Sequence, residues 1–342
     1  MMGLLKFRRV LLGCSLLFCL LSCGDQSKPW IKNTNAGGAL GTSYSIIYLT
    51  KDSLNFQKGI DSVFYAVNAS MSTYLPDSDI TKINKGDATV VVDHMFEEVF
   101  TIAKEVYTAT NGYFDPTVGV LVNAWGFGPG TGVKMDSASV KKLLKYVGFD
   151  KVNLTTEGRI QKNFSEIQLD FNAIAKGYAI DRLAAYLDSE EIENYLVEVG
   201  GEIVTKGENR SKGKKWVVGV DDPQVELGRR LKITLTLKDQ ALASSGNYRK
   251  FRVDSLTGKK YVHTIDPKSG FTKNSNVLAV SVIAENCATA DAYATAFMAM
   301  DLDESMGILD TTASLEGYLI YLDENGAVQE FMTPGFKEQV VR

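Results

Sequence analysis

The chain has 342 residues, of which 45% are hydrophobic and 23% are charged, and its formal net charge is −4 at pH 7. A chain of this length and apolar content can bury a full hydrophobic core and fold without cross-links. Its acidic balance argues against a nucleic-acid-binding protein, which would carry a basic stripe that contacts phosphates. We therefore expect no nucleic-acid partner.

The first 22 residues have the pattern of an export signal. Three basic residues precede an apolar run over residues 10–21, which is shorter than the roughly 20 residues that would span a bilayer. The run ends in Leu20-Leu21-Ser22-Cys23, which resembles the lipobox of bacterial lipoproteins, where cleavage leaves a lipidated N-terminal cysteine. A soluble secreted protein is the alternative, but its cleavage site would carry a small residue where this chain has Leu21. We expect a lipid on Cys23 and hence a membrane anchor.

Three regions follow from this interpretation. Residues 1–22 are predicted to be a lipoprotein signal peptide, residues 23–36 a flexible polar tether, and residues 37–342 one folded domain. Removing the signal takes away three positive charges and no negative charge, so the formal net charge falls from −4 to −7. Cys287 is then the one cysteine left for the folded body, which excludes an internal disulfide. We expect the protein on the periplasmic face of a membrane, with the inner membrane favoured over the outer.

The predicted elements mix helices and strands without a repeating unit. Residues 114–132 combine proline and glycine with apolar residues, so we expect a buried or ligand-lining irregular segment there. Because strands follow one another without helices between them, we predict the α+β class, with mixed, largely antiparallel sheets and packed helices in one compact domain, and not a doubly wound parallel sheet. Apolar spacing and turn residues predict the elements in chain order. The first part of the chain is predicted to form a strand over 42–49, helices over 55–70, 94–110 and 136–147, and a hairpin over 152–168. A helix that begins close to Asn172 is followed by strands over 195–205, 215–220, 231–237, 249–253 and 278–283, a helix over 288–300 and a closing hairpin over 317–331.

The segment from Asp170 to Asp181 places a carboxylate, small residues and Lys176 at one helix start. Free backbone N–H groups and the positive end of the helix dipole lie at such a start, and with a lysine they favour an anion such as a pyrophosphate. The alternative is an ordinary capped helix with a solvated lysine. The segment alone does not decide between the two.

Asp291 and Thr295 are four residues apart in a predicted helix, so their side-chain oxygens face the same way. Oxygen ligands suit magnesium rather than zinc or copper, and the remaining ligands would be waters, backbone carbonyls or substrate phosphates. The alternative is a threonine that bonds back to its own helix. Together with the segment above, these residues suggest a site for a pyrophosphate and a metal ion.

His263 lies at the end of a predicted strand, just before a turn at Asp266-Pro267, where a histidine can act as a general base. A lone histidine is more often structural, and His94 is expected to be a surface or capping residue at a helix start. Ser244-Ser245-Gly246-Asn247-Tyr248 resembles a turn that offers hydroxyl and amide groups to a ligand. The chain has no nucleophile elbow, Walker loop or dinucleotide fingerprint, which argues against a serine hydrolase and against nucleotide sites of those types.

These blocks, in this order, resemble the flavin transferase family, the ApbE or FAD:protein FMN transferases, over nearly the whole mature chain. The blocks that carry the resemblance are Gly41-Thr42-Ser43-Tyr44, Met71-Ser72-Thr73-Tyr74 with Asp77-Ser78, the run from Gly112 to Gly119 with Trp125-Gly126-Phe127-Gly128, Asp170 to Asp181, Glu198-Val199-Gly200-Gly201-Glu202, Ser244 to Tyr248, His263 to Gly270 and Ala290 to Thr295.

The resemblance implies a magnesium-dependent enzyme that splits FAD at its pyrophosphate, releases AMP and attaches FMN to a threonine of an acceptor flavoprotein. Such acceptors carry a flavinylation motif and include subunits of membrane redox pumps. The alternatives are a magnesium-dependent FAD pyrophosphatase that gives FMN and AMP, because water can replace the threonine, and an FAD-binding lipoprotein without catalysis.

The resemblance also assigns residues. It implies that Asp291, Thr295 and the Ala173 carbonyl bind Mg²⁺, although some relatives have a further acid where this chain has Ala294. His263 matches a histidine proposed to assist the transfer, and Asp170 is a second candidate base. Aromatic stacking on the flavin or adenine is open to Tyr74, Phe114 or Trp125, with Tyr74 favoured. The FAD contacts implied are Leu40, Tyr74, Tyr113, Phe114, Asp115, Asp170, Lys176 and Ile265.

Overall fold

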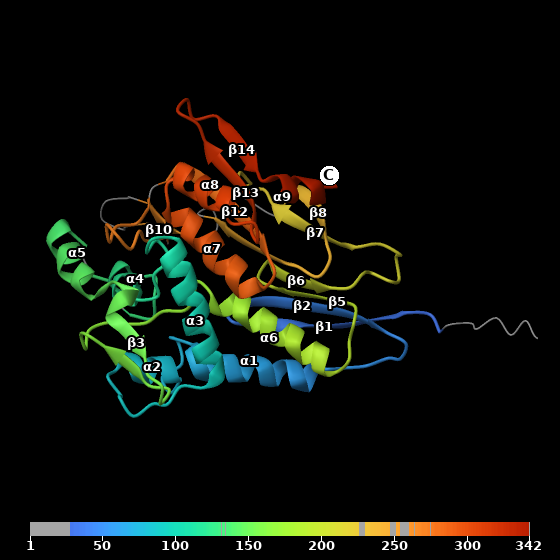
Figure 1. Cartoon of the computed structure of the whole chain (residues 1–342), viewed down its shortest axis with the longest axis horizontal. Helices are drawn as coiled ribbons and strands as arrows, with labels where there is room; N and C mark the ends of the chain where they lie inside the picture. The colour runs from blue at the N-terminus through green and yellow to red at the C-terminus, as the bar shows by residue number, and fades with distance from the viewer. Residues whose placement is uncertain are drawn as a thin grey trace, which may run out of the picture.

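An eight-stranded sheet in which every neighbouring pair is antiparallel forms the centre of the molecule (Figure 1). The computed structural model describes residues 28–130, 132–133, 135–225, 230–246, 251–253, 260–262, 264–273 and 275–341. The strands lie in the order β1 (Ile31–Ala39), β2 (Thr42–Thr50), β5 (Tyr195–Val199), β6 (Glu202–Lys206), β9 (Ala241–Gly246), β12 (Val277–Ala284), β13 (Glu316–Leu322) and β14 (Val328–Met332). Three further strand pairs are β3 (Val152–Leu154) with β4 (Ile160–Lys162), β7 (Trp216–Asp221) with β8 (Leu231–Leu237), and β10 (Phe251–Val253) with β11 (Lys260–Val262).

Four helices, α1, α3, α6 and α7, lie on one side of this sheet, and the β7–β8 hairpin and α9 cover part of the other side. In Figure 1, α6 and α7 run along the sheet, with α1 beside α6 and α3 beside α7. Alternate side chains of β6, β9 and β12 point to the two faces, and each face packs its own apolar cluster. The helices are α1 (Gln57–Met71), α2 (Asp79–Asn84), α3 (His94–Ala109), α4 (Gly119–Trp125), α5 (Ser137–Leu143), α6 (Ala175–Ser189), α7 (Cys287–Ala299), α8 (Leu302–Thr311) and α9 (Pro334–Gln339).

The predicted α+β class with largely antiparallel sheets is confirmed, and most predicted elements are present within a few residues of their expected bounds. The main error is at the N-terminal side, where residues 31–36 belong to strand β1 and not to the tether. Asn33 and Asn35 point inward in this strand, and Asn35 accepts a hydrogen bond from Tyr48 Oη at 3.0 Å. A strand that buries amides instead of apolar side chains shows no hydrophobic alternation, so its sequence resembles a polar linker.

Three other expectations are corrected. Residues 114–132 are buried in part, as expected, but they contain helix α4 rather than irregular chain alone. The predicted strand over 195–205 is a hairpin of β5 and β6, with Gly200-Gly201 as its turn. Ser244–Gly246 lie within β9 in the middle of the sheet and do not form a turn, while Asn247 and Tyr248 lie outside the described residues.

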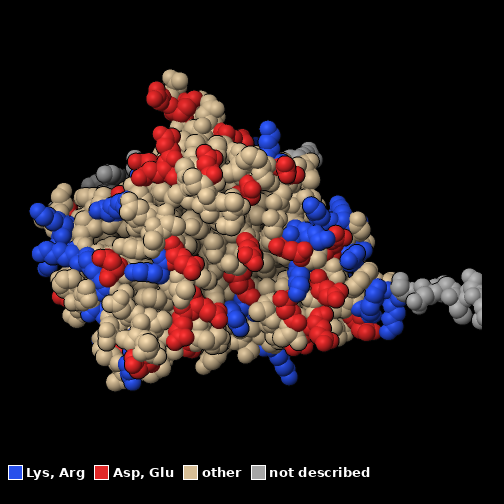
Figure 2. All heavy atoms as spheres, in the orientation of Figure 1, with Lys and Arg blue, Asp and Glu red and all other residues tan. Residues whose placement is uncertain are grey.

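The visible face carries side chains of both charge signs. Figure 2 shows basic side chains at the end of the molecule that carries α5, basic and acidic side chains together at the opposite end, and acidic side chains over α8 and at the tip of the β13–β14 hairpin. Among the described residues, no helix is both long and apolar enough to cross a membrane. The predicted signal peptide and Cys23 lie outside the described residues.

Helices α6 and α7 pack closely, and polar contacts join the middle of α6 to the start of α7. Asp181 on α6 accepts hydrogen bonds from the backbone N–H groups of Cys287 (2.7 Å) and Ala288 (2.8 Å), so it caps the first turn of α7. Gly177 is the point of closest approach, because a Cβ atom there would lie 2.3 Å from the Cys287 carbonyl oxygen. The helices can therefore keep this separation only if residue 177 has no side chain.

We predict opposite effects for two helical glycine-to-alanine substitutions. Gly177→Ala should lower the free energy of unfolding by about 1–3 kcal/mol, because the new methyl group overlaps backbone that cannot easily move. Gly307→Ala is the control, since a Cβ atom at this position of α8 meets nothing within 4 Å. This variant should be stabilised by about 0.5–1 kcal/mol. Urea denaturation of both variants tests the prediction, and equal effects at the two sites would contradict it.

Candidate functional site

The site lies where two hairpin turns of the sheet meet the start of α6 and the middle of α7. The β1–β2 turn at Leu40-Gly41 and the β5–β6 turn at Gly200-Gly201 are at the same end of adjacent strands. The Gly200 N–H donates to the Ser43 carbonyl at 3.0 Å, which fixes one turn against the other. Leu40 has a φ of 51° and packs between the two apolar clusters under the helices. These turns therefore form a rigid base for the site.

The first residue of α6 differs from the predicted one, and the observed helix start is better suited to binding a ligand. Residues 172–174 form a turn, and the helix begins at Ala175 rather than close to Asn172. Asp170 precedes the turn and accepts a hydrogen bond from the Asn172 N–H at 2.8 Å. Burial raises the pKa of the Asp170 carboxyl above its usual value. This turn leaves Asp170 outside the helix, beside the loop that carries Tyr74.

The Ala173 carbonyl at this turn is left without a hydrogen bond. In a regular helix the Gly177 N–H would donate to it, but this N–H donates instead to Asp291 Oδ2, at 3.1 Å. Within the described residues, no other N–H or O–H group donates to the Ala173 carbonyl oxygen. Asp291 itself is 4% exposed. The contact thus brings a buried carboxylate beside a backbone oxygen that can still bind a ligand.

Thr295 lies one turn along α7 from Asp291 and does not bond back to its helix. Its Oγ1 makes no hydrogen bond with any described residue, whereas Thr101 and Thr108 of α3 each donate to the carbonyl four residues earlier, at 2.8 Å. The alternative explanation for this threonine is therefore wrong. Its hydroxyl is half-buried and faces the same way as Asp291.

Lys176 forms an ion pair with a buried carboxylate, so it is not the solvated lysine of an ordinary capped helix. Its Nζ lies 2.9 Å from Oε2 of Glu202, whose side chain is 4% exposed. Burial lowers the pKa of Lys176, but the charges of Asp291 and Glu202 outweigh burial and raise this pKa overall. Burial raises the pKa of both Asp291 and Glu202 although the Lys176 charge opposes this shift, and the Asp291 charge adds to it for Glu202. When both carboxylates are ionised, the single ammonium leaves one negative charge of this cluster uncompensated.

These observations fit a hard divalent cation. Asp291, the Ala173 carbonyl and Thr295 supply oxygen donors, and the surplus negative charge favours a cation beside them. No group of three or more His, Cys, Asp or Glu side chains able to hold a metal exists within the described part of the chain. A cation here would therefore complete its shell with water or phosphate oxygens, which is usual for Mg²⁺.

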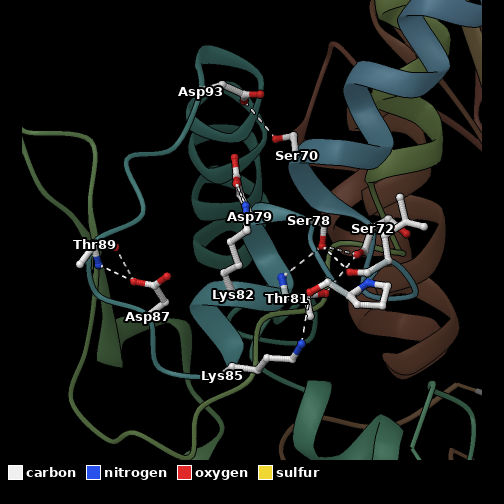
Figure 3. A network of polar contacts seen from close by, with 12 residues as sticks. Ser70, Ser72, Ser78, Asp79, Thr81, Lys82, Lys85, Asp87, Thr89 and Asp93 are labelled. Carbon is white, nitrogen blue, oxygen red and sulfur yellow. Dashed lines mark hydrogen bonds and ion pairs between the residues drawn. The ribbon is translucent and has the colours of Figure 1, made fainter.

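The loop from Ser72 to Ser78, which includes Tyr74, is held in place by the hydrogen bonds of Ser78 (Figure 3). Ser78 is buried and its Oγ donates to the carbonyls of Ser72 (2.6 Å) and Leu75 (3.0 Å), while the Thr81 N–H donates to it at 3.3 Å. The Tyr74 ring is 60% exposed, and its pKa is raised by burial and by the charge of Asp170. This fixed, accessible ring beside Asp170 is well placed to stack on a ligand.

A cavity of about 170 Å³ opens beside Asp170 and is lined by polar side chains. The Asn172 amide donates to Thr73 Oγ1 at 3.2 Å, which joins the Tyr74 loop to the start of α6. The lining includes Thr73, Thr81, Lys85, Asn123, Gln168 and Asp170. The cavity therefore connects the Tyr74 loop with α2, α4 and the strand-like segment before Asp170.

One of the remaining predicted ligand residues, Asp115, lines a second cavity, of about 280 Å³. Asp115 lines it and is buried, and its Oδ1 accepts hydrogen bonds from the Thr117 N–H (2.8 Å) and Oγ1 (2.6 Å). Lys268 also lines it, with Nζ 3.7 Å from the centre of the Tyr113 ring. Ile265 is 8% exposed and packs in the small core of this region. No described contact joins these residues directly to Asp291 or Lys176.

Two of the three proposed stacking side chains are core residues. Phe114 is 3% exposed and packs in the main apolar cluster. Trp125 is 6% exposed, and its Nε1 donates to the Gly270 carbonyl at 2.9 Å. Only the backbone of Phe114 can therefore reach a ligand, and the stacking role falls to Tyr74. His94 is exposed at the first residue of α3, where Asp93 is the cap, and His263 lies outside the described residues.

Three residues at or near the site, Glu202, Asp181 and Ser78, were not predicted to have a role in it. Glu202 follows Gly200-Gly201 directly, and an acid at the first position of a strand was the signal that could have identified it. Asp181 and Ser78 act through backbone groups of distant elements, which no local pattern shows.

Comparison with known proteins decides the family, because residues 40–319 match the model of the ApbE family. The chain belongs to the ApbE family. It is 33% identical to the FAD:protein FMN transferase of Vibrio cholerae over 338 residues, which covers 94% of this chain and 96% of that protein. It is 30% identical to the FAD:protein FMN transferase of Haemophilus influenzae over 331 residues, covering 93% and 94%.

Solved structures agree with this assignment. The flavin transferase ApbE from Vibrio cholerae superposes with a TM-score of 0.80 at 31% identity, covering 91% of this chain and all of that one. The apo form of the Pseudomonas stutzeri flavinyl transferase ApbE superposes with a TM-score of 0.79 at 26% identity, covering 91% and 97%. The α+β architecture is thus that of ApbE flavin transferases.

Asp115 provides a test of the electrostatics of the second cavity. Burial raises the pKa of Asp115 from 3.8 to about 6 in the folded protein. The folded state therefore binds this proton more tightly, so the stabilisation is complete below pH 3.8 and is lost as the pH rises through about 6. Asp115→Asn keeps an oxygen for Thr117 and removes the titration.

We predict that the unfolding free energy of Asp115→Asn rises relative to that of the wild type by about 1–2 kcal/mol between about pH 4.5 and about pH 8. Urea denaturation of both proteins across this range measures the difference. A difference that stays constant or falls with increasing pH would show that the buried carboxyl does not titrate in this way.

Proposed function

We propose that the protein transfers the FMN moiety of FAD to a threonine hydroxyl of an acceptor flavoprotein in a magnesium-dependent reaction that releases AMP. The observation that carries the proposal is the contact of the buried Asp291 carboxylate with the Gly177 N–H, which leaves the Ala173 carbonyl unbonded next to Lys176, with Thr295 one helical turn from Asp291. The names of the relatives support the reaction class. Acceptors would be exported flavoproteins with a flavinylation motif, such as redox-pump subunits.

Each residue has a defined part in this reaction. Asp291, Thr295 and the Ala173 carbonyl would hold Mg²⁺, which when bound would neutralise negative charge on the phosphoryl oxygens. Lys176 and the positive end of the α6 dipole attract the pyrophosphate. The threonine Oγ attacks the FMN phosphorus, the bond from this phosphorus to the bridging oxygen breaks, and AMP leaves with that oxygen. The threonine proton passes to a base, for which Asp170 and His263 are the candidates.

We also propose that the chain is exported and held by a lipid on Cys23 at the periplasmic face of a membrane, with the inner membrane favoured. Figure 1 shows that the described chain begins at one end of the sheet, far from α5. Labelled palmitate on the mature protein tests the anchor. An unlabelled protein, or a Cys23→Ser variant that keeps its label, would refute it.

One assay separates the proposed reaction from its two alternatives. The protein is incubated with FAD, Mg²⁺ and a candidate acceptor, and the acceptor is then denatured. Flavin fluorescence that stays on the denatured acceptor shows transfer. Release of FMN and AMP without labelled acceptor shows hydrolysis, and unchanged FAD shows binding alone.

We predict that Asp291→Asn lowers the transfer rate by at least about 100-fold, because it removes the charged metal ligand but keeps the side-chain shape. Asp303→Asn, on the exposed face of α8, is the matched control and should keep wild-type activity. Rates are measured over a range of Mg²⁺ concentrations. Wild-type activity of Asp291→Asn at low Mg²⁺ would refute the metal assignment.

We predict that Tyr74→Ala weakens FAD binding by about 10-fold through loss of the stacked ring. Tyr65→Ala is the control, because Tyr65 is 77% exposed on α1 and has no assigned role. Flavin fluorescence titration gives both dissociation constants. Equal dissociation constants for the two variants would show that Tyr74 does not stack on the flavin or adenine ring.

A further inference from the structure

Glu202 is buried beside the proposed metal ligands, and no step described above uses it. Its Oε2 lies 2.9 Å from Lys176 Nζ, and its side chain is 4% exposed. Among the buried side-chain polar atoms of the described residues, Glu202 Oε2 alone has no partner with good hydrogen-bond geometry. Burying a carboxylate in this way is costly. The pair is therefore held by charge attraction at a place where charge matters to the proposed reaction.

The carboxylate belongs to a rigid frame, whereas the lysine has a flexible stem. Glu202 is the first residue of β6, after a turn in which Gly200 and Gly201 have φ values of 66° and 106°. Glu198 Oε1 accepts a hydrogen bond from the Gly201 N–H at 2.7 Å, which fixes this turn. A lysine carries its point charge on four rotatable methylene groups. Glu202 therefore positions Lys176, and not the reverse.

Two buried carboxylates, Asp291 and Glu202, are possible ion-pair partners of Lys176. The charges of Asp291 and Glu202 both act on its ammonium, but the ion pair is formed with Glu202. Asp291 instead receives the Gly177 N–H and faces the Ala173 carbonyl side of the turn. An ammonium bound to Asp291 would occupy the oxygen that a cation needs.

We propose that Glu202 is a positioning residue, which holds the Lys176 ammonium away from Asp291 and so keeps the Asp291 carboxylate open to a divalent cation. This inference rests on the metal site of the proposed function but not on flavin transfer. Without the Glu202 charge, Lys176 pairs with Asp291 and competes with the cation. Cation affinity then falls although every metal ligand is intact.

Direct titration with Mn²⁺ tests the inference without any flavin or acceptor. Free Mn²⁺ is measured by electron paramagnetic resonance in the purified protein and its variants. Glu202→Gln should raise the Mn²⁺ dissociation constant by about 10-fold or more, as loss of a residue behind the ligands commonly does. In the Lys176→Met background, Glu202→Gln should change the Mn²⁺ dissociation constant by less than about 2-fold, because the competing ammonium is absent.

Glu198→Gln is the matched control, because it removes the same charge from the same hairpin but keeps an oxygen for Gly201. It should leave the Mn²⁺ dissociation constant unchanged. If Glu202→Gln does not fold, as judged by thermal unfolding without metal, Glu202→Asp replaces it. Glu202→Asp withdraws the carboxylate by one methylene group. It should raise the Mn²⁺ dissociation constant when Lys176 is present and leave this constant unchanged in the Lys176→Met background.

Two results would overturn the inference. Equal weakening of Mn²⁺ binding by Glu202→Gln with and without Lys176 would mean that Glu202 acts on the cation directly. Unchanged binding in the wild-type background would mean that Lys176 does not compete. Mn²⁺ binding that survives Asp291→Asn would instead refute the metal site of the proposed function, so the two failures are distinguishable.

Discussion

Two buried carboxylates, Asp291 on α7 and Glu202 on β6, lie near a single ammonium, that of Lys176 on α6. Buried charges are tolerated when they are paired, and one ammonium cannot pair with both. When both carboxylates are ionised, the start of α6 therefore keeps a surplus negative charge beside an unbonded carbonyl. Such a place favours a cation together with an anionic ligand, which is the combination that magnesium and a pyrophosphate supply. The other contacts of the site hold the charged groups of Asp291, Glu202 and Lys176 in position.

The frame around the charges is rigid because backbone contacts set it. Gly177 allows α6 to touch the Cys287 carbonyl, and Asp181 caps the first turn of α7 from the neighbouring helix. The same close packing sends the Gly177 N–H to Asp291, and this frees the Ala173 carbonyl. Helix packing and ligand binding are thus parts of one arrangement, so a change that separates the helices also disturbs the oxygen donors.

Residues predicted to contact the ligand lie at two separate cavities. The first is beside Asp170, on the loop side that carries the exposed Tyr74, and the second is lined by Asp115 and Lys268, whose ammonium lies over the Tyr113 ring. Within the described residues, no contact joins the second cavity to the charged cluster of Asp291, Glu202 and Lys176.

The sequence by itself determined the α+β class, most helices and strands, and the residue types of the site, because hydrophobic spacing, turn residues and oxygen ligands are local properties. It did not reveal β1, whose inward residues include the amides Asn33 and Asn35, or the α4 helix inside a glycine-rich segment. Only the tertiary structure decided that Lys176 pairs with Glu202, 26 positions along the chain, and that Phe114 and Trp125 are core residues. These outcomes depend on which elements pack together. The pattern of residues within one segment does not show the charge, burial or hydrogen bonds that result from its contacts with another segment.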